Sequence, residues 1–505
     1  MRSILTYCVI AFAVLLCGCA QVKPQPDYDR ANEHIQDATG YAPGYRPSEE
    51  LLASQQVELL MHDGLSLDDA VKLALLNNPT LQATYRDVGI ARADVVQSGL
   101  FSNPTFAFSA QFPEGGGRSN IQASLAQNIV DLWQIPIRKR AAERSLDESI
   151  LRLARAAAQL CIDTKIAYYA AVAADQNLDI ARENYDIVKR LLDVALARQK
   201  AGFVSELDVN LNRQTVLTAQ LEVQQARLDA AAARRQLALL LGVTTRVEDV
   251  ALTTPLSEAP LVWWTTDELL EVAREHRLDL RAARKSAEAA AVRLEFEYRK
   301  IFPDFNIGAA LERNERRALP GRDVLADTAR ASIANGALTA PDIQSRGQRN
   351  QERRQEIDAI LGPAFSLTLP IFDQNQAQIA RARFTFEQTL KQVEALERGI
   401  VQETRQSLDA ATTAAEIARF YEQSLLPQSQ SNLELTRTSY EKGATPILVV
   451  LDAQRSLLAA RRGAVTARQA ASTSLAELER VTAQPLRALP TSMPASQPAS
   501  LPEGF

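Results

Sequence analysis

Four stretches of the chain alternate between apolar residues and small or polar residues. They span residues 104–112, 120–128, 304–312 and 364–371. In the first of them Phe106, Phe108 and Phe112 share one parity, while Thr105 and Ser109 take the other. A period of two residues is typical of a β-strand whose two faces meet different surroundings. We therefore expect four strands, in two pairs.

Long helical segments separate the strand pairs. The segment Ile137–Lys200 contains no Gly or Pro, and the segment Gln376–Lys442 is interrupted only at Gly399 and Pro427. Pro427 is expected to kink its helix, because proline removes one backbone donor. Shorter helices are expected over residues 66–99, 205–241, 266–300 and 447–482. In the first copy of this pattern, two shorter helices placed end to end would match one long helix, which favours a bundle of uniform length.

A heptad repeat of small apolar residues marks two of the shorter helices. In the first it consists of Val209, Val216, Val223, Ala230 and Leu237, and in the second of Val450, Leu457, Ala464, Ala471 and Leu478. Small residues in such a seam let neighbouring helices approach closely. Leu221 and Leu228 form a second stripe, about 120° around the helix axis. Two stripes predict two neighbours, which fits a curved wall of helices better than a simple coiled-coil dimer.

The two halves of the chain are copies of each other. Leu81, Pro104 and Phe106 recur at one constant spacing as Leu280, Pro303 and Phe305. The spacing increases after the first strand of each copy, because the second copy carries extra residues in one loop. We assign a first repeat to 65–245, with strands at 104–112 and 120–128, and a linker to 246–264. The second repeat is 265–482, with strands at 304–312 and 364–371 and a long loop at 313–361; the tail 483–505, rich in Pro, Ser and Ala, is expected to be disordered.

The N-terminus has the pattern of an export signal. After Arg2, the apolar run Ile4–Leu16 is too short to cross a bilayer core, which needs about 20 residues. We assign residues 1–18 to a signal peptide. The sequence Leu16-Cys17-Gly18-Cys19 resembles the lipobox of bacterial lipoproteins, so we expect lipid attachment at Cys19 and an extended segment over 19–64. The alternative is ordinary signal cleavage near the same place.

The strands allow a membrane interpretation. No later apolar run is long enough for a spanning helix, so that any spanning part must be a closed barrel. Four strands cannot close alone, because single-chain barrels have about eight or more. Several subunits would therefore have to share one barrel. The alternative is an ordinary antiparallel sheet with one buried face.

The composition of the chain argues against a catalytic activity of this protein. The 505 residues carry a net charge of −5, which disfavours a broad nucleic-acid surface, and three His make a His-rich metal site improbable. The run Gly115-Gly116-Gly117 lacks the Gly-Lys-Ser/Thr of a phosphate loop. Cys161 lies on a long helical pattern and is interpreted as a packed side chain. We expect no cofactor, no metal, no catalytic residue and no enzymatic activity.

The order, duplication and spacing of several motifs point to one family. They are Leu67-Asp68-Asp69-Ala70, Gly202–Val209, Gly362–Phe365, Pro370–Asp373, Tyr440–Gly443 and Val450–Gln454. Over residues 65–482 the chain resembles the TolC-like outer-membrane efflux channels, in their lipoprotein branch. The resemblance implies a mainly α-helical fold with a small β part, in which a helix-strand-strand-helix-helix unit is duplicated. It also implies a homotrimer with a twelve-stranded membrane β-barrel, continued by a long periplasmic α-helical barrel.

The resemblance further implies a gate at the helical tips, whose turns are at Gly202 and Gly443. Asp208 and Tyr440 correspond to residues that bond across the closed gate in the family, whereas the partnering Arg of the family is Thr445 here. Asp452 corresponds to a ring of carboxylates that narrows the pore, and such a ring favours cations. The alternative is that Asp208 and Asp452 are solvated caps near tight turns.

The implied function is a passive, gated export duct of a tripartite efflux or type I secretion system. Its partners would be outer-membrane lipid, a periplasmic adaptor and an inner-membrane pump at the tips, with no nucleic acid. The second hypothesis is a lipid-anchored periplasmic coiled-coil spacer without a pore. That spacer would not need the alternating strands, which occur in both copies.

Overall fold

The computed structural model describes residues 20–43, 45, 47, 64–112, 119–243, 250–256, 262–315, 333–336, 357–442 and 444–485. Several sequence-based predictions lie outside these residues. They are the signal peptide 1–18, Cys19, Gly443, the first strand-to-strand loop, most of the long loop 313–361, and the tail beyond residue 485.

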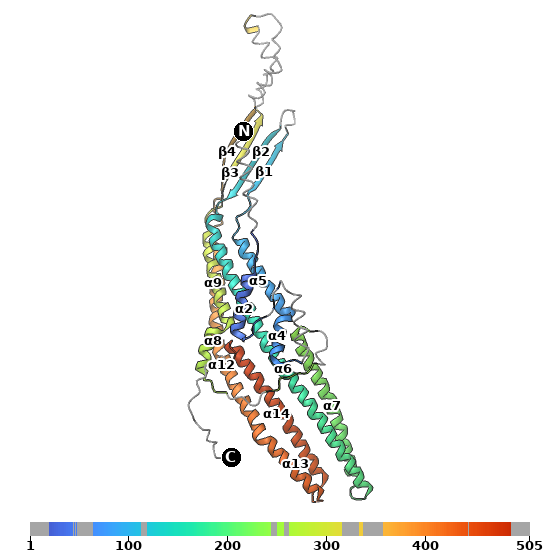
Figure 1. Cartoon of the computed structure of the whole chain (residues 1–505). Helices are drawn as coiled ribbons and strands as arrows, with labels where there is room; N and C mark the ends of the chain where they lie inside the picture. The colour runs from blue at the N-terminus through green and yellow to red at the C-terminus, as the bar shows by residue number, and fades with distance from the viewer. Residues whose placement is uncertain are drawn as a thin grey trace. The chain divides into compact units, whose positions relative to one another are not determined.

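The described residues are mainly helical and contain one small antiparallel sheet, which confirms the predicted fold class (Figure 1). The helices are α2 (Gln25–Thr39), α4 (Leu67–Asn77), α5 (Pro79–Ser98), α6 (Asp131–Lys200), α7 (Glu206–Leu241), α8 (Thr266–His276), α9 (Leu278–Arg299), α12 (Gln376–Phe420), α13 (Leu426–Glu441) and α14 (Ile447–Thr482). The strands are β1 (Thr105–Gln111), β2 (Asn120–Asn128), β3 (Phe305–Glu315) and β4 (Ile357–Leu367), and a π-helical turn, η2 (Tyr421–Leu425), joins α12 to α13.

The chain divides into two compact units that do not coincide with the two sequence repeats. Unit 1 comprises Met1–Asp94, Glu143–Ala289 and Glu387–Phe505, and unit 2 comprises Val95–Ala142 and Ala290–Phe386. Each unit therefore takes part of both copies. The reason is visible in the sheet, where β2 of the first copy pairs with β3 of the second.

Unit 2 holds the sheet, in which the strands follow one another in the order β1-β2-β3-β4 and every neighbouring pair is antiparallel. Phe106 pairs with Leu125, Leu125 with Ala309, and Ala309 with Pro363. Directly paired residues lie on the same face of a sheet. The residues that the alternation assigned to one parity therefore share one face across all four strands.

The observed strands differ from their predicted bounds at one place in particular. The fourth strand was expected over 364–371 but runs over Ile357–Leu367. Its early start includes Pro363, which has no backbone N–H to donate. Within this sheet β4 is an edge strand, where a proline is tolerated because the missing donor would face outward.

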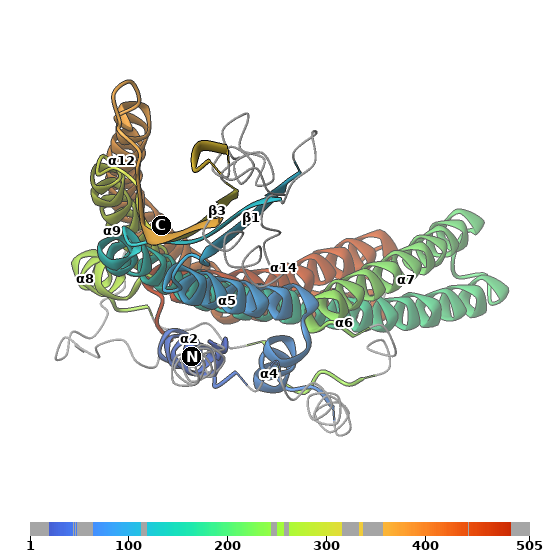
Figure 2. The ribbon, with the colours of Figure 1, turned by 90° about the horizontal axis from the view of Figure 1, so that it is seen from above.

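The heptad seams lie buried in unit 1. Figures 1 and 2 show α7 alongside the C-terminal half of α6. On α7 the seam residues Val209, Ala230 and Leu237 are buried, whereas Leu221 and Leu228 of the second stripe are exposed. All five seam residues of α14 are buried. The packed interface of these helices therefore consists largely of Ala, Val and Leu, as the heptads predict.

Polar pairs connect the two copies along the helices. The ammonium group of Lys165 on α6 lies 2.5 Å from a carboxylate oxygen of Glu479 on α14. Further along α6, Asn184 accepts a buried hydrogen bond of 3.2 Å from Gln454 on α14. Exposed ion pairs join Glu183 to Arg461 and Glu222 to Arg462. Each pair joins a first-copy helix to α14, so that together they set the axial position of one copy against the other.

The segment predicted to run extended contains a helix. Helix α2 buries Tyr28, Ala31 and Ile35, and this amphipathic spacing gives it a face for packing. The prediction of an extended course over 19–64 is therefore wrong for Gln25–Thr39. The extended course was inferred from four prolines. Pro24 and Pro26 lie at the start of the helix, where proline is well tolerated, and Pro43 and Pro47 lie beyond its end.

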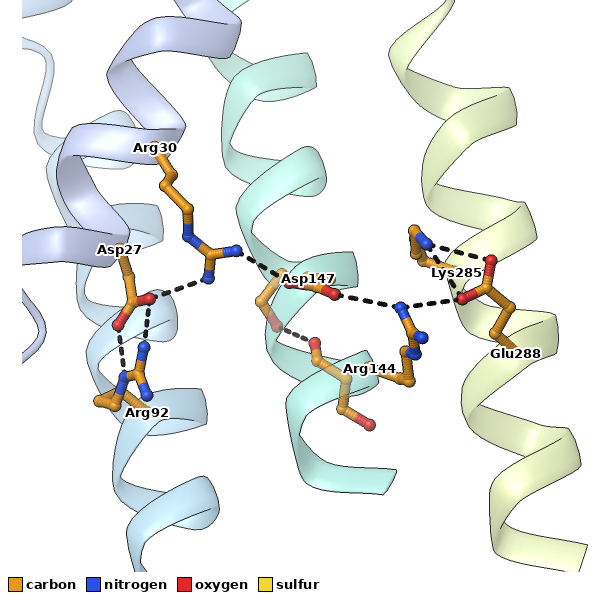
Figure 3. A network of polar contacts seen from close by, with 9 residues as sticks. Asp27, Arg30, Arg92, Arg144, Asp147, Lys285 and Glu288 are labelled. Carbon is orange, nitrogen blue, oxygen red and sulfur yellow. Dashed lines mark hydrogen bonds and ion pairs between the residues drawn. The ribbon is translucent and has the colours of Figure 1, made fainter. Parts of the chain in front are cut away.

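An ion-pair network holds α2 in unit 1 (Figure 3). The fully buried Asp27 accepts two hydrogen bonds of 2.5 Å from Arg92 of α5, and one of 2.9 Å from Arg30. Arg30 also pairs with Asp147 of α6 at 3.1 Å. From Asp147 the network continues through Arg144 of α6 to Glu288 and Lys285 of α9, as the labelled side chains show. The buried carboxylate is thus compensated by two guanidinium groups, as a buried charge requires.

Two predicted helices are each broken into two. The helix expected over 66–99 ends at Asn77 and resumes at Pro79, because Asn78 precedes a proline and is extended, with a ψ of 118°. The helix expected over 266–300 breaks at the corresponding Arg277, with a ψ of 116°, although no proline follows. The sequence alone gave no sign of the second break.

The long helices also depart from their predicted course. Helix α6 starts at Asp131 and runs for 70 residues with Pro136 inside it, so Pro136 is not its boundary. Gly399 does not interrupt α12. The interruption expected at Pro427 is a π-turn, Tyr421–Leu425. There the ring of Tyr421 lies against Gly463 of α14, where a Cβ atom would come within 2.5 Å of the ring.

Candidate functional site

One face of the sheet carries large apolar side chains in the open. Phe106 is 69%, Phe108 62% and Phe365 62% exposed. The rings of Phe305 and Phe365 stack with their centroids 6.2 Å apart. The apolar face is continuous, because the strand register aligns these residues with Leu125, Ile307 and Leu311. An exposed apolar patch across a whole sheet marks a surface that contacts lipid or another apolar partner.

The opposite face is made of small or polar residues. Ala107 pairs with Ser124 and Ser124 with Ala310, while Ala126 pairs with Gly308. At Gly308 a Cβ atom would lie 2.0 Å from the backbone oxygen of Leu125. The two strands thus approach so closely here that only glycine fits.

Exposed aromatic side chains lie beyond the strand ends of unit 2. They are Phe101, Trp133, Phe302 and Phe372, of which Phe372 is 91% exposed. Aromatic residues at the edges of an apolar band are typical of lipid-facing sheets, where they meet the interface with water. Our sequence analysis did not single out these four residues. The signal was present, since each lies within a few residues of a predicted strand.

The first helical tip is a turn between α6 and α7. Gly202 has a φ of 79°, a left-handed conformation that favours glycine. Asp208 lies one turn into α7 and forms a reciprocal capping box with Ser205. Its carboxylate accepts hydrogen bonds from the backbone N–H of Ser205 at 3.1 Å and from the Ser205 hydroxyl at 2.8 Å. Asp208 therefore has the capping role that the alternative interpretation gives it.

The second tip is organised around Tyr440. Its ring packs against the buried cluster of Ile447, Val450 and Leu451 in α14. The guanidinium carbon of Arg198, at the end of α6, lies 4.6 Å from the ring centroid. This is a cation–π contact between the first and second tips. Within the described part of the chain, no hydrogen bond joins Tyr440 to Asp208.

The remaining predicted residues of the second tip are Asp452 and Thr445. Asp452 lies exposed on the first turns of α14 and has no hydrogen bond or ion pair among the described residues. The hydroxyl oxygen of Thr445 is buried without a partner in that same part of the chain. The structure therefore brings Tyr440 together with Arg198, a residue that our sequence analysis did not name, rather than with Asp208 or Asp452.

Two helical surfaces of unit 1 expose large apolar residues. On α7 these residues are Leu217, Leu221, Leu228 and Leu239, and on α12 and α13 they are Ile417, Phe420 and Leu435. Leu221 is 72% exposed. Large apolar side chains repeated along an exposed helix face indicate a surface for another helix.

The described residues contain no group of three or more His, Cys, Asp or Glu that is placed to hold a metal ion. Among those same residues, no helix has an apolar stretch long enough to span a bilayer. Cys161 is buried, and burial raises the pKa of its thiol to about 12. The thiol is thus protonated at neutral pH and unreactive as a nucleophile.

The family model described as "Outer membrane efflux protein" matches residues 70–243 and 269–484, which is most of the chain and includes both copies. The chain is 28% identical over 349 residues to Protein CyaE of Bordetella pertussis, an alignment that covers 65% of this chain and 72% of that protein. It is 26% identical to the pyoverdine export outer membrane protein OpmQ of Pseudomonas aeruginosa, over 80% of this chain and 82% of OpmQ.

Among solved structures, the open state of the MtrE outer membrane channel of Neisseria gonorrhoeae has a similar fold. The TM-score is 0.63 at 19% sequence identity, and the superposition covers 83% of this chain and 89% of MtrE. The family model covers both strand pairs and both helical tips. On these grounds the chain belongs to the outer membrane efflux protein family.

Proposed function

We propose that this chain is the outer-membrane channel component of a tripartite efflux or type I secretion system. In this proposal three copies assemble into a passive duct that leads from the periplasm to the exterior. Their sheets close a twelve-stranded barrel in the membrane, and their helices continue it as a tube in the periplasm. A poreless coiled-coil spacer has no use for the exposed apolar sheet face, and family membership favours the channel.

The main evidence for this proposal is that the two faces of the sheet differ in chemistry. Large apolar residues lie on one face of all four strands, and apart from Ile360 the other face carries small or polar residues. A barrel wall between lipid and a water-filled lumen requires this arrangement. The sheet has two edge strands, β1 and β4, so that it can continue into the sheet of a neighbouring copy.

A pair of neighbouring substitutions tests the membrane role. Phe108→Asp places a charge on the apolar face, and Ala107→Asp places the same charge on the opposite face. A charge at the midplane of the lipid face of a barrel costs about 2–4 kcal/mol per subunit for Arg or Lys and less for Asp, and in a trimer this cost is incurred three times. We expect Phe108→Asp to abolish insertion into the outer membrane, while Ala107→Asp inserts and changes single-channel conductance in planar bilayers. Equal behaviour of the two variants would contradict the proposal, as would a purified wild-type protein that does not conduct.

The exposed apolar faces of α7 and of α12–α13 support the trimer. In the proposed trimer the α7 face of one copy packs against the α12–α13 face of the next. Such a contact joins two different surfaces, and it forms a closed ring when the rotation from copy to copy adds up to a full turn. Leu228→Glu on the α7 face is expected to weaken a heat-sensitive trimer band in gel electrophoresis. Gln220→Glu, at an exposed position of α7 about 100° around the helix axis from Leu221, is the matched control and should leave the band unchanged.

We also propose a gate at the tips, built from Asp208, Tyr440 and Asp452, with turns at Gly202 and Gly443. Asp452 is exposed and unpaired among the described residues, which supports a ring of three carboxylates near the axis. Arg198 takes the place of the Arg that the family has at Thr445, because it contacts Tyr440 from the other tip. Asp452→Ala should reduce cation selectivity and block by divalent cations, whereas Asp193→Ala, at an exposed acid of α6, should change neither. Unchanged selectivity in Asp452→Ala would reject the ring.

The membrane attachment and the partners complete the proposal. Lipid attachment at Cys19 would fix the N-terminus to the membrane, and intact mass spectrometry of the mature protein tests it directly. The helical tips would meet a periplasmic adaptor and through it an inner-membrane pump. Site-specific crosslinking from Phe203, which is 81% exposed at the first tip, should capture the adaptor in cells.

A further inference from the structure

A cavity in unit 1 is not accounted for by a channel function. Its lining residues come from the end of α2, the middle of α6, the break between α8 and α9, and the end of α14. Figure 1 labels these helices. The volume of the cavity is about 60 Å³. That is room for about four water molecules, or for one small organic molecule in their place.

The cavity has an apolar floor. It is formed by Ala38, Ala158, Ile162, Leu278, Ala483 and Pro485. Cys161 adds a protonated thiol to the same wall. Such a surface suits the apolar body of a ligand, and a few polar groups around it would set the orientation.

The two carboxylates of the cavity wall are already paired. Glu479 lies 2.5 Å from the ammonium of Lys165. Asp279 accepts two hydrogen bonds from Arg277, at 3.0 and 2.6 Å. Both acids are therefore neutralised by cations of the protein, and neither leaves a free negative charge to repel an anion.

Two guanidinium groups of the same wall still have unused donors. Arg155 of α6 makes no hydrogen bond or ion pair with any described residue, although its charge acts on Asp279. Among the described residues, Arg480 of α14 donates only through its Nε, to Glu477 at 2.6 Å. The remaining N–H groups of these two residues match the acceptors of a carboxylate, to which guanidinium binds strongly.

We propose that this cavity binds a small organic anion with one carboxylate on a compact apolar body. The carboxylate bonds to Arg155 and Arg480, and the body rests on the floor of Ala158, Ile162 and Leu278. The ligand would thereby connect α6 to the last turn of α14. This site is separate from the helical tips and from the sheet, so that its existence does not depend on the proposed conduction.

Propionate is a probe of suitable size, and propionamide is its uncharged counterpart. Binding to the full-length protein in detergent is measured by calorimetry, and the site is located by backbone hydrogen exchange followed by mass spectrometry. We expect propionate to bind saturably and to slow exchange at the end of α2 and in the last turn of α14 at least about fivefold, and propionamide at the same concentration to do neither.

Substitutions then assign the carboxylate contacts. Arg155→Gln and Arg480→Gln should each raise the propionate dissociation constant about tenfold, the usual effect of losing one charge-assisted hydrogen bond. Arg152→Gln is the matched control, because Arg152 lies one turn earlier on α6, does not line the cavity and is 69% exposed. Arg155 makes no hydrogen bond or ion pair with a described residue, so this variant is expected to fold even if Arg480→Gln does not. Absence of saturable binding, equal protection by propionamide, or unchanged affinity in Arg155→Gln would overturn the proposal.

Discussion

The two copies of the repeat make the same helix break by different means. In the first copy Asn78 breaks the helix before Pro79, and its side chain caps the next helix by accepting from the N–H groups of Thr80 and Leu81. In the second copy the break at Arg277 has no proline. It is held by ion pairs to Asp279 and, from the next long helix, to Glu403 at 2.6 Å. The first copy thus relies on local backbone chemistry, whereas the second adds to its local ion pair one with a helix that is distant in sequence.

The same contrast extends to the long helices and the tips. Helix α6 of the first copy is continuous, whereas α12 and α13 are separated by a π-turn whose Tyr421 needs the space at Gly463. At the first tip a capping box starts α7, while α14 starts at Pro446 without a side-chain cap. Because its order depends on distant partners, the second copy is expected to open first when those contacts are weakened.

The largest effect is expected at Arg277. Arg277→Ala leaves the buried carboxylate of Asp279 without its partner, which typically costs about 3–5 kcal/mol. Asn78→Ala, at the corresponding break of the first copy, loses a cap and should cost only about 1–2 kcal/mol. Chemical denaturation of both variants measures the difference, and equal losses would show that the two breaks are equivalent.

The same pair predicts a dependence on pH. Burial raises the pKa of Asp279, but the hydrogen bonds and charge of Arg277 outweigh burial and hold this pKa below its usual value. The stabilisation is therefore present above about pH 4, near the ordinary pKa of an aspartate, and is lost as the pH falls through the lowered value. Wild-type protein should lose more stability on acidification than Asp279→Asn, measured by thermal unfolding between about pH 6 and pH 3.

A somewhat smaller effect is expected in the sheet. Gly308 of β3 and Ser109 of β1 occupy corresponding positions in the two copies. Gly308→Ser would push a Cβ atom into the backbone of β2 and should cost about 3 kcal/mol, because backbone atoms must move. Ser109→Gly on the edge strand should change stability by less than about 1 kcal/mol. The amounts of the two variants in the outer membrane are compared with that of the wild type. A normal amount of Gly308→Ser would show that β2 and β3 can move apart without loss of folded protein.

A moderate effect is expected at the π-turn. Gly463→Ala should destabilise the second copy by about 1–2 kcal/mol, because the new methyl group overlaps the ring of Tyr421. In Tyr421→Ala the same glycine substitution should instead be stabilising, since alanine is the better helix former. A double-mutant cycle measures the coupling. If the stability changes of the two single substitutions simply add up in the double variant, the ring of Tyr421 moves aside freely.

The smallest effect is expected at the caps of the tips. Ser205→Ala removes the capping box of α7 and should cost about 1 kcal/mol. Pro446→Ser offers α14 the side-chain cap that it lacks and should slow hydrogen exchange in its first turn. If the second tip exchanges no faster than the first in the wild-type protein, the contrast between the copies does not extend to their ends.

Much of the fold could be predicted because it follows from periodicity. The heptads of α7 and α14 identified their buried seams, and the alternation around Phe106 and Phe365 identified the common face of the sheet. These patterns repeat over many residues, so that a single exception does not hide them. The same periodicity gave no warning of helix α2, which is short and lies among prolines.

The details that could not be predicted depend on single long-range contacts. At the break, Arg277 is paired with Glu403, which lies more than a hundred residues later in the chain. Arg198 likewise reaches Tyr440 only because the two tips lie side by side in the folded chain. No local pattern encodes such contacts, which is why the sequence pointed to Asp208 and missed Arg198.

The polar pairs along α6 and α14 restrict how this molecule can move. A seam of alanines and valines offers nearly the same contacts after one helix slides by a turn, about 5.4 Å. Such a slide would separate Lys165 from Glu479 and Asn184 from Gln454 at once, and would leave buried polar groups unsatisfied. Tilting or twisting about these points keeps them joined. Any widening of the helical tips should therefore proceed by rotation about fixed polar pivots, with no travel along the helix axis.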